Sequence, residues 1–564
     1  MQSKSLGDLL RKQVGRLGAK SAMETPTKDG VRTISYAKLG DKVRAYAGAL
    51  RSLGIRRGDK VAIQSDNCVE WAFVDWACSS MGVVSVPIYP TLPADQTVYI
   101  VCDSEASLVV AGSEEHLKKV QGLDGVRSIL LKGATGSLDE LSESTALTEA
   151  EWSAEVDQTT REDLFTIIYT SGTTGQPKGA MLPHRAALHV VETAVDVLPL
   201  HESDVFLSFL PMSHVYERIA GQVLPIQMGA TIAYAKNLAS LAADMQKVRP
   251  TIMLCVPRFL EAFRDRVFDA VEKQGGFKKT LFDMAMSQGV ARAQGKFAPL
   301  SGLLDKIVMS KIRERAGGRL RFFVSGGAAL PPHVAEFLMA TRLGVLQGYG
   351  LTETAGGTCI NHPDRNKYWT VGEPLAMDVK IADDGEILIK GPALMLGYYN
   401  LPEETAQAID ADGWFHSGDI GEFEGKTLKI TDRKKDLIVL GNGKNVAPQP
   451  IENKLRESAF IAEAVLFGDQ MDACVALVIP NAEAVRRELG LDEKAELRDS
   501  DAVRKLIKAE IDKTNKRLAP FEMVKRFALL DQPFSIETGE LTPSLKVKRR
   551  VVKKKYADLI KTLS

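Results

Sequence analysis

Short apolar segments of strand length alternate with longer segments of helical pattern through most of the chain. Lys60–Gln64 and Val83–Ile88 have the length of strands, and Val69–Met81 between them has the length of a helix. Ser107–Ala111 and Ser128–Leu131 continue the alternation. Strands that alternate with helices usually pair in parallel and are covered by those helices. The pattern predicts an α/β fold with helix-covered, mostly parallel sheets.

The pattern changes near Gly372. Short segments at Val379–Ala382 and Glu386–Lys390, with Asp-Gly turns nearby, predict a small antiparallel sheet or barrel-like part. A charged run, Asp432–Asp436, follows, and the roughly 130 residues after it suffice for a small separate domain. We therefore expect a large domain of residues 1–431, a hinge at residues 432–436, and a small, mobile α+β domain of residues 437–564.

Composition narrows the class of protein. The 564 residues exceed what one core usually holds, and 72 basic residues balance 72 acidic ones. A net charge of zero, without interleaved aromatic and basic residues, gives no reason to expect nucleic-acid binding. The six cysteines are scattered and form no CxxC pattern, so we expect neither disulfides nor structural zinc, and a reducing cytoplasm fits best.

The chain gives little reason to expect a membrane span. Met1–Lys20 lacks the apolar core of a secretory signal, and no stretch of eighteen uncharged apolar residues exists. Peripheral contact with the inner face of a membrane stays open. The basic tail, Lys546–Lys555, is either a solvated helix or a contact for phosphates or acidic lipid headgroups. Nothing in the sequence indicates an oligomeric state.

The most informative segment is Tyr169–Gly179, YTSGTTGQPKG. Leu164–Tyr169 before it predicts a strand, and Pro183 after it predicts a helix start. Its glycines let backbone N–H groups turn toward an anion, while its hydroxyl groups and Lys178 add donors and positive charge. These residues suit a polyphosphate. The GxxxxGK[ST] pattern is absent, so a P-loop kinase or ATPase fits poorly, and a plain surface loop is the other interpretation.

This segment resembles the signature of the adenylate-forming superfamily, which includes acyl-CoA synthetases, luciferases and peptide-synthetase adenylation domains. Further segments similar to those of the superfamily follow in order: VSGGAA (324–329), QGYGLTET (347–354), GWFHSGDIG (413–421), DRKKD (432–436) and LTPSLK (541–546). The last one reads Leu545-Lys546 where many members have Gly-Lys. TPSLK, LPMSHVYER (210–218) and GKNVAPQPIE (443–452) are similar to segments of long-chain fatty acyl-CoA synthetases.

The resemblance implies a two-step reaction. A long-chain fatty acid would attack the α-phosphate of ATP, with Mg²⁺ present, to give an acyl-adenylate and pyrophosphate. Coenzyme A would then displace AMP. One alternative is a ligase that hands the acyl group to a carrier protein. Others are a phosphotransferase, which would release ADP, and an inactive protein that keeps the fold.

The resemblance also implies which residues bind the nucleotide. The phosphates would be bound by Thr170, Ser171, Gly172, Thr173, Thr174, Gly175 and Lys178. Adenine would lie against Gly326, Gly327, Ala328, Gly348, Tyr349 and Gly350, and the ribose would be held by Asp419 and Arg433. Asp419 is otherwise interpreted as a turn former.

The remaining assignments concern catalysis and motion. Thr352 would touch the α-phosphate, Glu353 would bind Mg²⁺, and His214 would lie near the substrate carboxylate. Lys546 would bridge the carboxylate and ATP, Lys435 would mark the hinge, and Gly443 would lie beside the path of the thiol. The plainer interpretations are a surface charge for Glu353 and Lys435, a structural histidine for His214, and a basic-tail lysine for Lys546.

Overall fold

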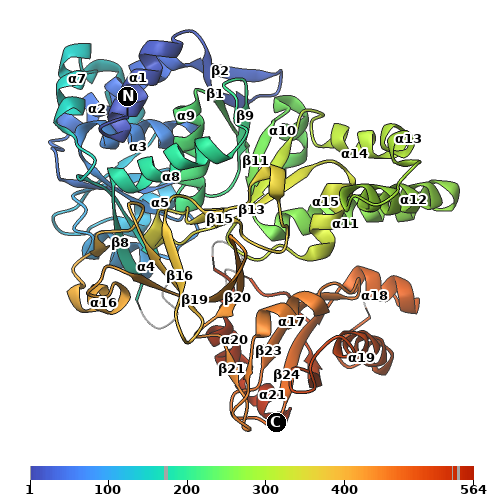
Figure 1. The fold of residues 1–564 in the computed structure, drawn as a ribbon. Coiled ribbons are helices and arrows are strands. Elements are labelled where there is room, and N and C mark those ends of the chain that lie inside the picture. The colour runs from blue at the N-terminus through green and yellow to red at the C-terminus, as the bar shows by residue number, and fades with distance from the viewer. Residues whose placement is uncertain (1, 171–175, 494, 536–537, 543–546, 564) are drawn as a thin grey trace. The chain divides into compact units, whose positions relative to one another are not determined.

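The computed structural model describes residues 2–170, 176–493, 495–535, 538–542 and 547–563 (Figure 1). Its contacts divide the chain into two compact units, and each is described by itself. The first unit comprises residues 1–379, 389–415 and 425–428, and the second comprises residues 380–388, 416–424 and 429–564. The small sheet near residue 380 thus groups with the C-terminal part. The hinge at residues 432–436 stays a prediction.

The first unit contains a seven-stranded sheet in the order β18-β8-β7-β4-β3-β5-β6. Its strands are β3 (Lys60–Gln64), β4 (Val84–Ile88), β5 (Leu108–Ala111), β6 (Arg127–Leu130), β7 (Leu164–Thr170), β8 (Lys178–Pro183) and β18 (Gly397–Tyr398). The neighbours from β7 to β6 pair in parallel, which confirms the expected alternation of strands and helices. Strand β8, which pairs antiparallel with β7, was not predicted. It begins at the charged residue Lys178, so its sequence does not start as an apolar strand.

A second sheet of nine strands has the order β15-β14-β13-β12-β11-β9-β10-β1-β2. Its strands are β1 (Ser21–Pro26), β2 (Val31–Ser35), β9 (Val205–Ser208), β10 (Thr231–Tyr234), β11 (Ile252–Cys255), β12 (Phe322–Ser325), β13 (Gly344–Tyr349), β14 (Cys359–Ile360) and β15 (Glu373–Pro374). The six central strands pair in parallel, and the edges are antiparallel. Both large sheets therefore match the predicted class.

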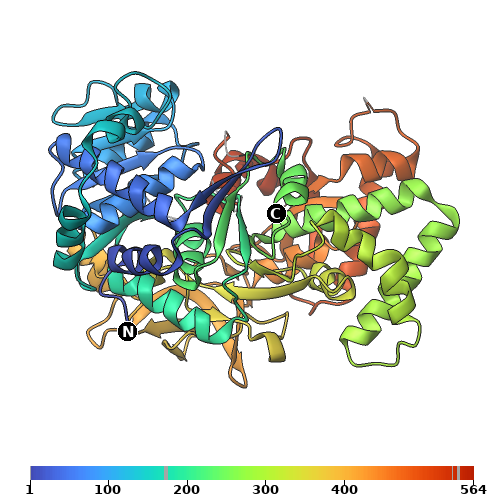
Figure 2. The same cartoon turned by 90° about the horizontal axis from the view of Figure 1, so that it is seen from above.

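Helices cover these sheets (Figures 1 and 2). The longer ones are α1 (Leu6–Leu17), α2 (Tyr36–Ser52), α3 (Val69–Met81), α4 (Ala94–Asp103), α7 (Glu149–Gln158), α8 (His184–Val197), α11 (Pro257–Gln274), α12 (Gly276–Ala293) and α15 (Pro332–Ala340). The shorter ones are α5 (Glu114–Val120), α6 (Leu138–Thr145), α9 (Leu224–Met228), α10 (Leu241–Val248), α13 (Ser301–Leu304), α14 (Ser310–Arg315) and α16 (Pro402–Ala408). The described residues of this unit also form two π-helical turns, η1 (Glu217–Val223) and η2 (Asp305–Met309), and two 3₁₀ turns, η3 (Thr352–Thr354) and η4 (Pro363–Arg365).

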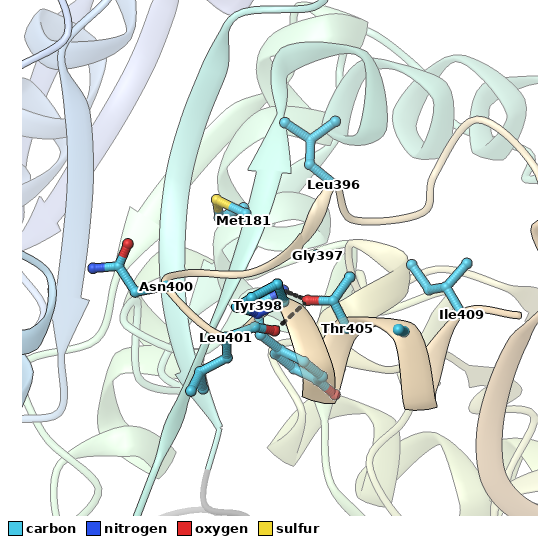
Figure 3. A pocket seen from close by; sticks show the side chains of 10 residues that line it. Met181, Leu396, Gly397, Tyr398, Asn400, Leu401, Thr405 and Ile409 are labelled. Atoms are coloured by element: carbon cyan, nitrogen blue, oxygen red, sulfur yellow. Dashed lines mark hydrogen bonds between the residues drawn. The ribbon is translucent and has the colours of Figure 1, made fainter.

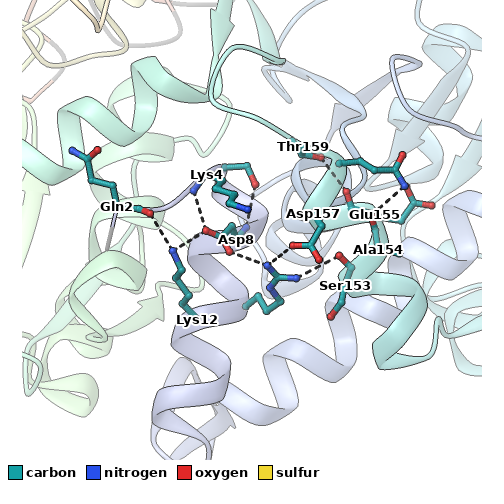
Figure 4. Close-up of polar contacts among 12 residues, drawn as sticks. Gln2, Lys4, Asp8, Lys12, Ser153, Ala154, Glu155, Asp157 and Thr159 are labelled. Atoms are coloured by element: carbon teal, nitrogen blue, oxygen red, sulfur yellow. Dashed lines mark hydrogen bonds and ion pairs between the residues drawn. The ribbon is translucent and has the colours of Figure 1, made fainter.

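Polar contacts anchor the N-terminal helix α1 (Figure 4). Ser5 caps the helix by accepting a hydrogen bond from the backbone N–H of Asp8 at 3.1 Å. Lys12 pairs with the Asp8 carboxylate at 2.8 Å, and Arg11 bridges Asp8 and Asp157 of α7 at 3.0 and 2.8 Å. The Arg11–Asp157 pair thereby joins the N-terminal helix to α7.

A four-stranded sheet, β16-β17-β19-β20, with an open strand order, lies mostly in the second unit. Its strands are β16 (Asp378–Ile381), β17 (Glu386–Lys390), β19 (Phe415–Glu424) and β20 (Thr427–Arg433). A sheet was one of the two forms that the sequence predicted here. A two-stranded ribbon, β21 (Ile438–Val439) and β22 (Asn445–Val446), follows.

The C-terminal core of this unit is a three-stranded sheet, β23-β24-β25, flanked by helices. Its elements are α17 (Pro448–Leu455), β23 (Ile461–Phe467), β24 (Cys474–Pro480), α18 (Ala482–Leu489), α19 (Asp501–Asn515), β25 (Val524–Leu529), α20 (Arg549–Lys555) and α21 (Ala557–Thr562). Alternate residues of β24 enter two separate buried clusters, one on each face. Burial on both faces explains why β24 is an uninterrupted apolar run.

None of the helices among the described residues combines the length and the apolar character needed to cross a bilayer.

Candidate functional site

Strands β7 and β8 hold the two ends of the glycine-rich segment. Thr170 and Lys178 are the last pair in the antiparallel register, and the Thr170 hydroxyl lies 3.5 Å from the Lys178 carbonyl. Ser171, Gly172, Thr173, Thr174 and Gly175 lie outside the described residues. The hairpin therefore fixes where the predicted phosphate-binding segment begins and ends.

Tyr398 joins Lys178 to Glu353. The Tyr398 hydroxyl donates a hydrogen bond to Glu353 Oε1 at 2.8 Å, and Lys178 Nζ lies 5.2 Å from the centre of the Tyr398 ring. The Glu353 carbonyl also accepts a hydrogen bond from the backbone N–H of Met395 at 2.8 Å. Burial, reinforced by the Glu353 charge, raises the pKa of Tyr398, so this hydroxyl stays protonated and able to donate. Two predicted site residues thus meet at one aromatic ring.

The strand that carries Tyr398 borders a pocket (Figure 3). The Thr405 hydroxyl accepts from the backbone N–H of Tyr398 at 2.9 Å and donates to the Leu401 carbonyl at 2.8 Å. The pocket is lined mainly by apolar groups: Met181, Leu396, Gly397, Tyr398, Asn400, Leu401, Pro402, Thr405, Ala406 and Ile409. Thr405 therefore holds the β18 backbone in the position from which Tyr398 reaches Glu353.

His214 and Gly326 meet through Tyr216. The Tyr216 backbone N–H donates to His214 Nδ1 at 3.1 Å, which places the proton of a neutral imidazole on Nε2. The Tyr216 hydroxyl donates to the Val324 carbonyl at 2.8 Å. A Cβ at Gly326 would approach the Tyr216 ring to 3.2 Å, so a side chain there would press on the ring. Gly326 thus makes room for Tyr216, an aspect that the motif did not show.

The remaining predicted adenine residues follow the ends of β12 and β13. Gly327, with φ +83°, and exposed Ala328 continue from β12 beyond Gly326. Gly348 and the buried Tyr349 end β13. A Cβ at Gly350 would clash with the backbone of Gly356, so glycine is required where these two chain segments cross. Thr352 and Glu353 begin the 3₁₀ turn η3 immediately afterwards.

The second unit holds the predicted ribose residues. Arg433 Nε lies 3.3 Å from Asp419 Oδ1, and the Asp419 side chain is 6% exposed. Lys434 and Lys435 are both exposed, and Lys434 pairs with Asp384 and Glu386 at 2.6 and 2.9 Å. The charged run is therefore only partly a solvated surface.

Two further features belong to this unit. Gly443, with φ +78°, forms the turn between β21 and β22, where its N–H donates to the Leu440 carbonyl. Asp432 accepts from the backbone N–H of Gln449 at the start of α17, and burial raises the Asp432 pKa to about 6. Lys546 lies outside the described residues.

A magnesium ion fits the chemistry of Glu353. Among the residues that the structure describes, no three His, Cys, Asp or Glu side chains gather to hold a metal. Mg²⁺ usually takes one or two carboxylates and completes its coordination with substrate phosphates and water. A single carboxylate, held at Tyr398 together with Lys178 of the predicted phosphate-binding segment, is therefore a suitable donor set.

Sequence reasoning did not predict the roles of Tyr398, Tyr216, Glu217 and Arg218. The last three lie within LPMSHVYER, so the motif marked the segment without showing what these side chains contact. Arg218 is fully buried, contacts Asp75 with Nε at 2.9 Å and Thr166 with Nη1 at 2.6 Å, and lies 4.2 Å from the Phe165 ring centre. It thereby ties η1, next to His214, to α3 and β7.

Glu217 predicts a pH-dependent stability. It is 1% exposed, its Oε1 accepts from Gln222 at 3.2 Å, and its Oε2 has no hydrogen-bond partner among the described residues. Burial raises the Glu217 pKa from 4.5 to about 7. The folded chain therefore binds the Glu217 proton more tightly than the unfolded chain does. This preference adds to the free energy of unfolding in full below pH 4.5, and the added stability is lost as the pH rises through about 7.

The expected result is that Glu217→Gln removes this loss. Relative to the parent, the variant should gain roughly 3 kcal/mol in free energy of unfolding between pH 5 and pH 8.5. Urea unfolding of both proteins at the two pH values measures the difference. Parallel pH profiles would contradict a raised Glu217 pKa.

Comparison with known proteins identifies the family of this chain. Residues 10–399 match the AMP-binding enzyme family, and residues 435–563 match the AMP-binding enzyme C-terminal domain. A long-chain-fatty-acid–CoA ligase of Mycobacterium bovis, FadD15, is 34% identical over 95% of this chain and 93% of its own. The peroxisomal long chain acyl-CoA synthetase 6 of Arabidopsis thaliana is 33% identical over 93% of this chain and 81% of its own.

A solved structure supports the fold. The anthranilate CoA ligase AuaEII, in complex with anthranoyl-AMP, superposes with a TM-score of 0.77 at 20% identity, covering 98% of this chain and 97% of the other. At that identity the likeness concerns the fold alone. The family match covers more than half of the chain, and it includes Lys178, Glu353 and Tyr398. The protein is therefore a member of the AMP-binding enzyme family.

Proposed function

We propose that the protein is an AMP-forming long-chain fatty acid–CoA ligase. The observation that supports the proposal is that Lys178 and Glu353 both contact Tyr398. Relatives that match 95% of this chain are named long-chain-fatty-acid–CoA ligases. In the first step a fatty acid carboxylate oxygen bonds to the α-phosphorus of ATP, and the bond to the pyrophosphate leaving group breaks. In the second, the thiol sulfur of coenzyme A bonds to the acyl carbon, AMP leaves, and the thiol loses its proton.

The first step brings an anion to a polyanion, so positive charge must offset their repulsion. Lys178, at the start of β8, supplies a cation next to the phosphate segment, and Thr170 with residues 171–175 supplies donors. Bound at Glu353, Mg²⁺ would neutralise phosphate charge. Tyr398 acts as a positioning residue, because its hydroxyl fixes the Glu353 carboxylate. Thr352, next in the chain, contacts the α-phosphate in this assignment.

Nucleotide and acyl group are held by separate sets of residues. Asp419 accepts from the ribose hydroxyls, since an ionised carboxylate offers two acceptor oxygens, and Arg433 keeps it ionised and oriented. Adenine lies against Tyr349 and residues 326–328. In this proposal His214, whose Nδ1 accepts a hydrogen bond from the Tyr216 N–H, lies near the substrate carboxylate.

We also propose that the small domain moves between the steps. Lys546 cannot occupy the site while a thiol enters, so rotation about residues 432–436 would withdraw Lys546 and bring the Gly443 turn toward the thiol path. This is gating by a bistable arrangement of domains. Lys435 is exposed in the predicted hinge and, among the described residues, forms no ion pair like those of Lys434 with Asp384 and Glu386.

The positioning role of Tyr398 gives a testable result. Tyr398→Phe removes one hydrogen bond to a charged group, so we expect roughly a tenfold loss of adenylation rate and a higher Mg²⁺ concentration for half-maximal rate. Pyrophosphate release at varied Mg²⁺ measures both. Tyr399→Phe is the matched control, because the Tyr399 hydroxyl bonds Glu105 at an exposed position. An unchanged Mg²⁺ dependence would refute the role.

The function itself is tested by its products. Purified protein receives ATP, Mg²⁺ and medium- to long-chain fatty acids, with and without coenzyme A, and nucleotides and acyl products are identified by mass spectrometry. The proposal expects AMP and acyl-CoA, with the longer acids preferred. Acyl-AMP that never becomes acyl-CoA would indicate a carrier-protein acceptor, which the names of the relatives do not favour, and ADP would indicate a phosphotransferase.

A further inference from the structure

Helices α12 to α14 concentrate positive charge on a chain without net charge. Residues 276–315 contain eight Lys and Arg against three Asp and Glu, a local net charge of +5. Both views of the fold show these yellow-green helices at the outer edge of the first unit (Figures 1 and 2). None of the residues assigned to the candidate site lies in this segment.

The same forty residues also expose apolar side chains. Of twelve large apolar side chains that are exposed in the described part of the chain, six lie here. Four of them define the 297–307 face: Phe297, Leu300, Leu303 and Ile307, which are 88, 46, 59 and 42% exposed. Residues 300, 303 and 307 have the spacing of one face of a helix. Their exposure is thus a continuous stripe and not a set of scattered residues.

The other side of this helical segment is already buried in the core. Leu304, Met309 and Ile312 are buried in the core that packs under the nine-stranded sheet. A surface helix normally needs one apolar face, which it turns to the core. The 297–307 face is a second one, and core packing does not account for it. Exposed apolar stripes of this kind mark binding surfaces.

Lysines surround the stripe. Lys296 precedes Phe297, Lys306 lies within the stripe, and Lys311 follows Ile307 by one helical turn. All three are exposed, and within the described residues no carboxylate forms an ion pair with them. Lysine stems can lie along apolar surface while the ammonium group reaches an anion.

We propose that the 297–307 face is a docking surface for an anionic lipid bilayer. Apolar side chains would enter the boundary between headgroups and acyl chains, and Lys296, Lys306 and Lys311 would contact lipid phosphates. Charge complementarity favours an anionic lipid surface, because residues 276–315 carry a net charge of +5 and Lys296, Lys306 and Lys311 form no ion pair with a carboxylate of the described residues. The inference goes beyond the proposed function and does not depend on it, since docking requires neither ATP nor chemistry.

The basic tail is less suited to this role. Arg549 pairs with Glu452 at 2.7 Å, Lys553 with Asp469 at 2.7 Å, and Lys555 with Glu540 at 2.8 Å. Its one exposed large apolar side chain among the described residues is Val551. Much of the tail's charge is therefore already neutralised within the second unit.

The test is sedimentation of the full chain with vesicles. Vesicles of phosphatidylcholine alone are compared with vesicles that also contain phosphatidylglycerol, without nucleotide, at low and physiological salt. We expect binding to the anionic vesicles that weakens with salt. The triple variant Phe297→Ser, Leu303→Gln, Ile307→Gln should bind at least tenfold less, whereas Phe423→Ser, an exposed phenylalanine elsewhere, should bind like the parent.

A second set of variants tests the charges. Lys296→Gln, Lys306→Gln and Lys311→Gln together should weaken binding at low salt and flatten its salt dependence, whereas Lys553→Gln with Lys554→Gln should not. Circular dichroism confirms that each variant is folded. The proposal is overturned if the parent does not bind anionic vesicles, or if only the Lys553→Gln, Lys554→Gln variant loses binding. It is also overturned if the triple apolar variant dissociates a dimer without changing vesicle binding. Because docking is measured without nucleotide and acyl-CoA formation is measured without vesicles, failure of docking and failure of the proposed function are distinguishable.

Discussion

Lys546→Ala is expected to abolish formation of the acyl-adenylate while leaving the second step nearly intact. In the proposed reaction the lysine carries the positive charge that bridges the fatty acid carboxylate and the ATP oxygens in the transition state. Removing one such group from an electrostatic site typically costs a hundred- to a thousandfold in rate. The second step needs this lysine withdrawn, so conversion of supplied acyl-adenylate to acyl-CoA should change by no more than a few fold.

Two assays separate the steps: fatty-acid-dependent pyrophosphate release, and thioester formation from synthetic acyl-adenylate and coenzyme A. Lys548→Ala is the matched control, because it removes a cation of the same basic segment two residues away. Equal loss of both steps in Lys546→Ala would refute the assignment. A large loss of adenylation in Lys548→Ala alone would assign the catalytic role to Lys548. The presence of Leu545-Lys546, where many members of the superfamily have Gly-Lys, would then reflect that difference.

Arg218→Ala is expected to destabilise the first unit by about 3–5 kcal/mol, since it leaves the Asp75 carboxylate buried without its cation. The substitution also removes the hydrogen bond to Thr166 and the contact with the Phe165 ring. Urea unfolding followed by tryptophan fluorescence measures the loss, with Trp71 close to the guanidinium group, 5.9 Å from it.

An exposed pair in the same unit supplies the comparison. Arg365 contacts both carboxylate oxygens of Glu373, at 2.6 and 2.9 Å, but its side chain is 57% exposed. Arg365→Ala should therefore cost below about 1 kcal/mol. Replacing Asp75 and Arg218 together with apolar residues should recover much of the loss, because the uncompensated charge is what costs most. If Arg218→Ala and Arg365→Ala lowered the free energy of unfolding by similar amounts, burial would not determine how much an ion pair contributes to stability.

Local pattern predicted much of the fold. The expected segments at Lys60–Gln64, Val69–Met81 and Glu386–Lys390 are β3, α3 and β17. They were readable because apolar runs of strand length and helical spacing are local properties. Strand β8 was missed, because its polar first residue, Lys178, belongs both to a strand and to the phosphate segment. The pattern of apolar and polar residues also did not predict that the small sheet near residue 380 groups with the C-terminal part, because that grouping depends on contacts between residues far apart in the sequence.

The site divides in the same way. The sequence by itself determined the family, and with it the expected reaction and the residue types at Lys178, Glu353, Asp419 and Lys546, because ordered motifs preserve the chemical groups that phosphate and ribose require. Only the tertiary structure decided what supports them. Tyr398 lies 45 residues from Glu353 and Arg218 lies 143 residues from Asp75, and no periodicity connects positions so far apart. The exposed 297–307 face likewise became visible only when the core had taken one side of its helix, since both sides are apolar in the sequence.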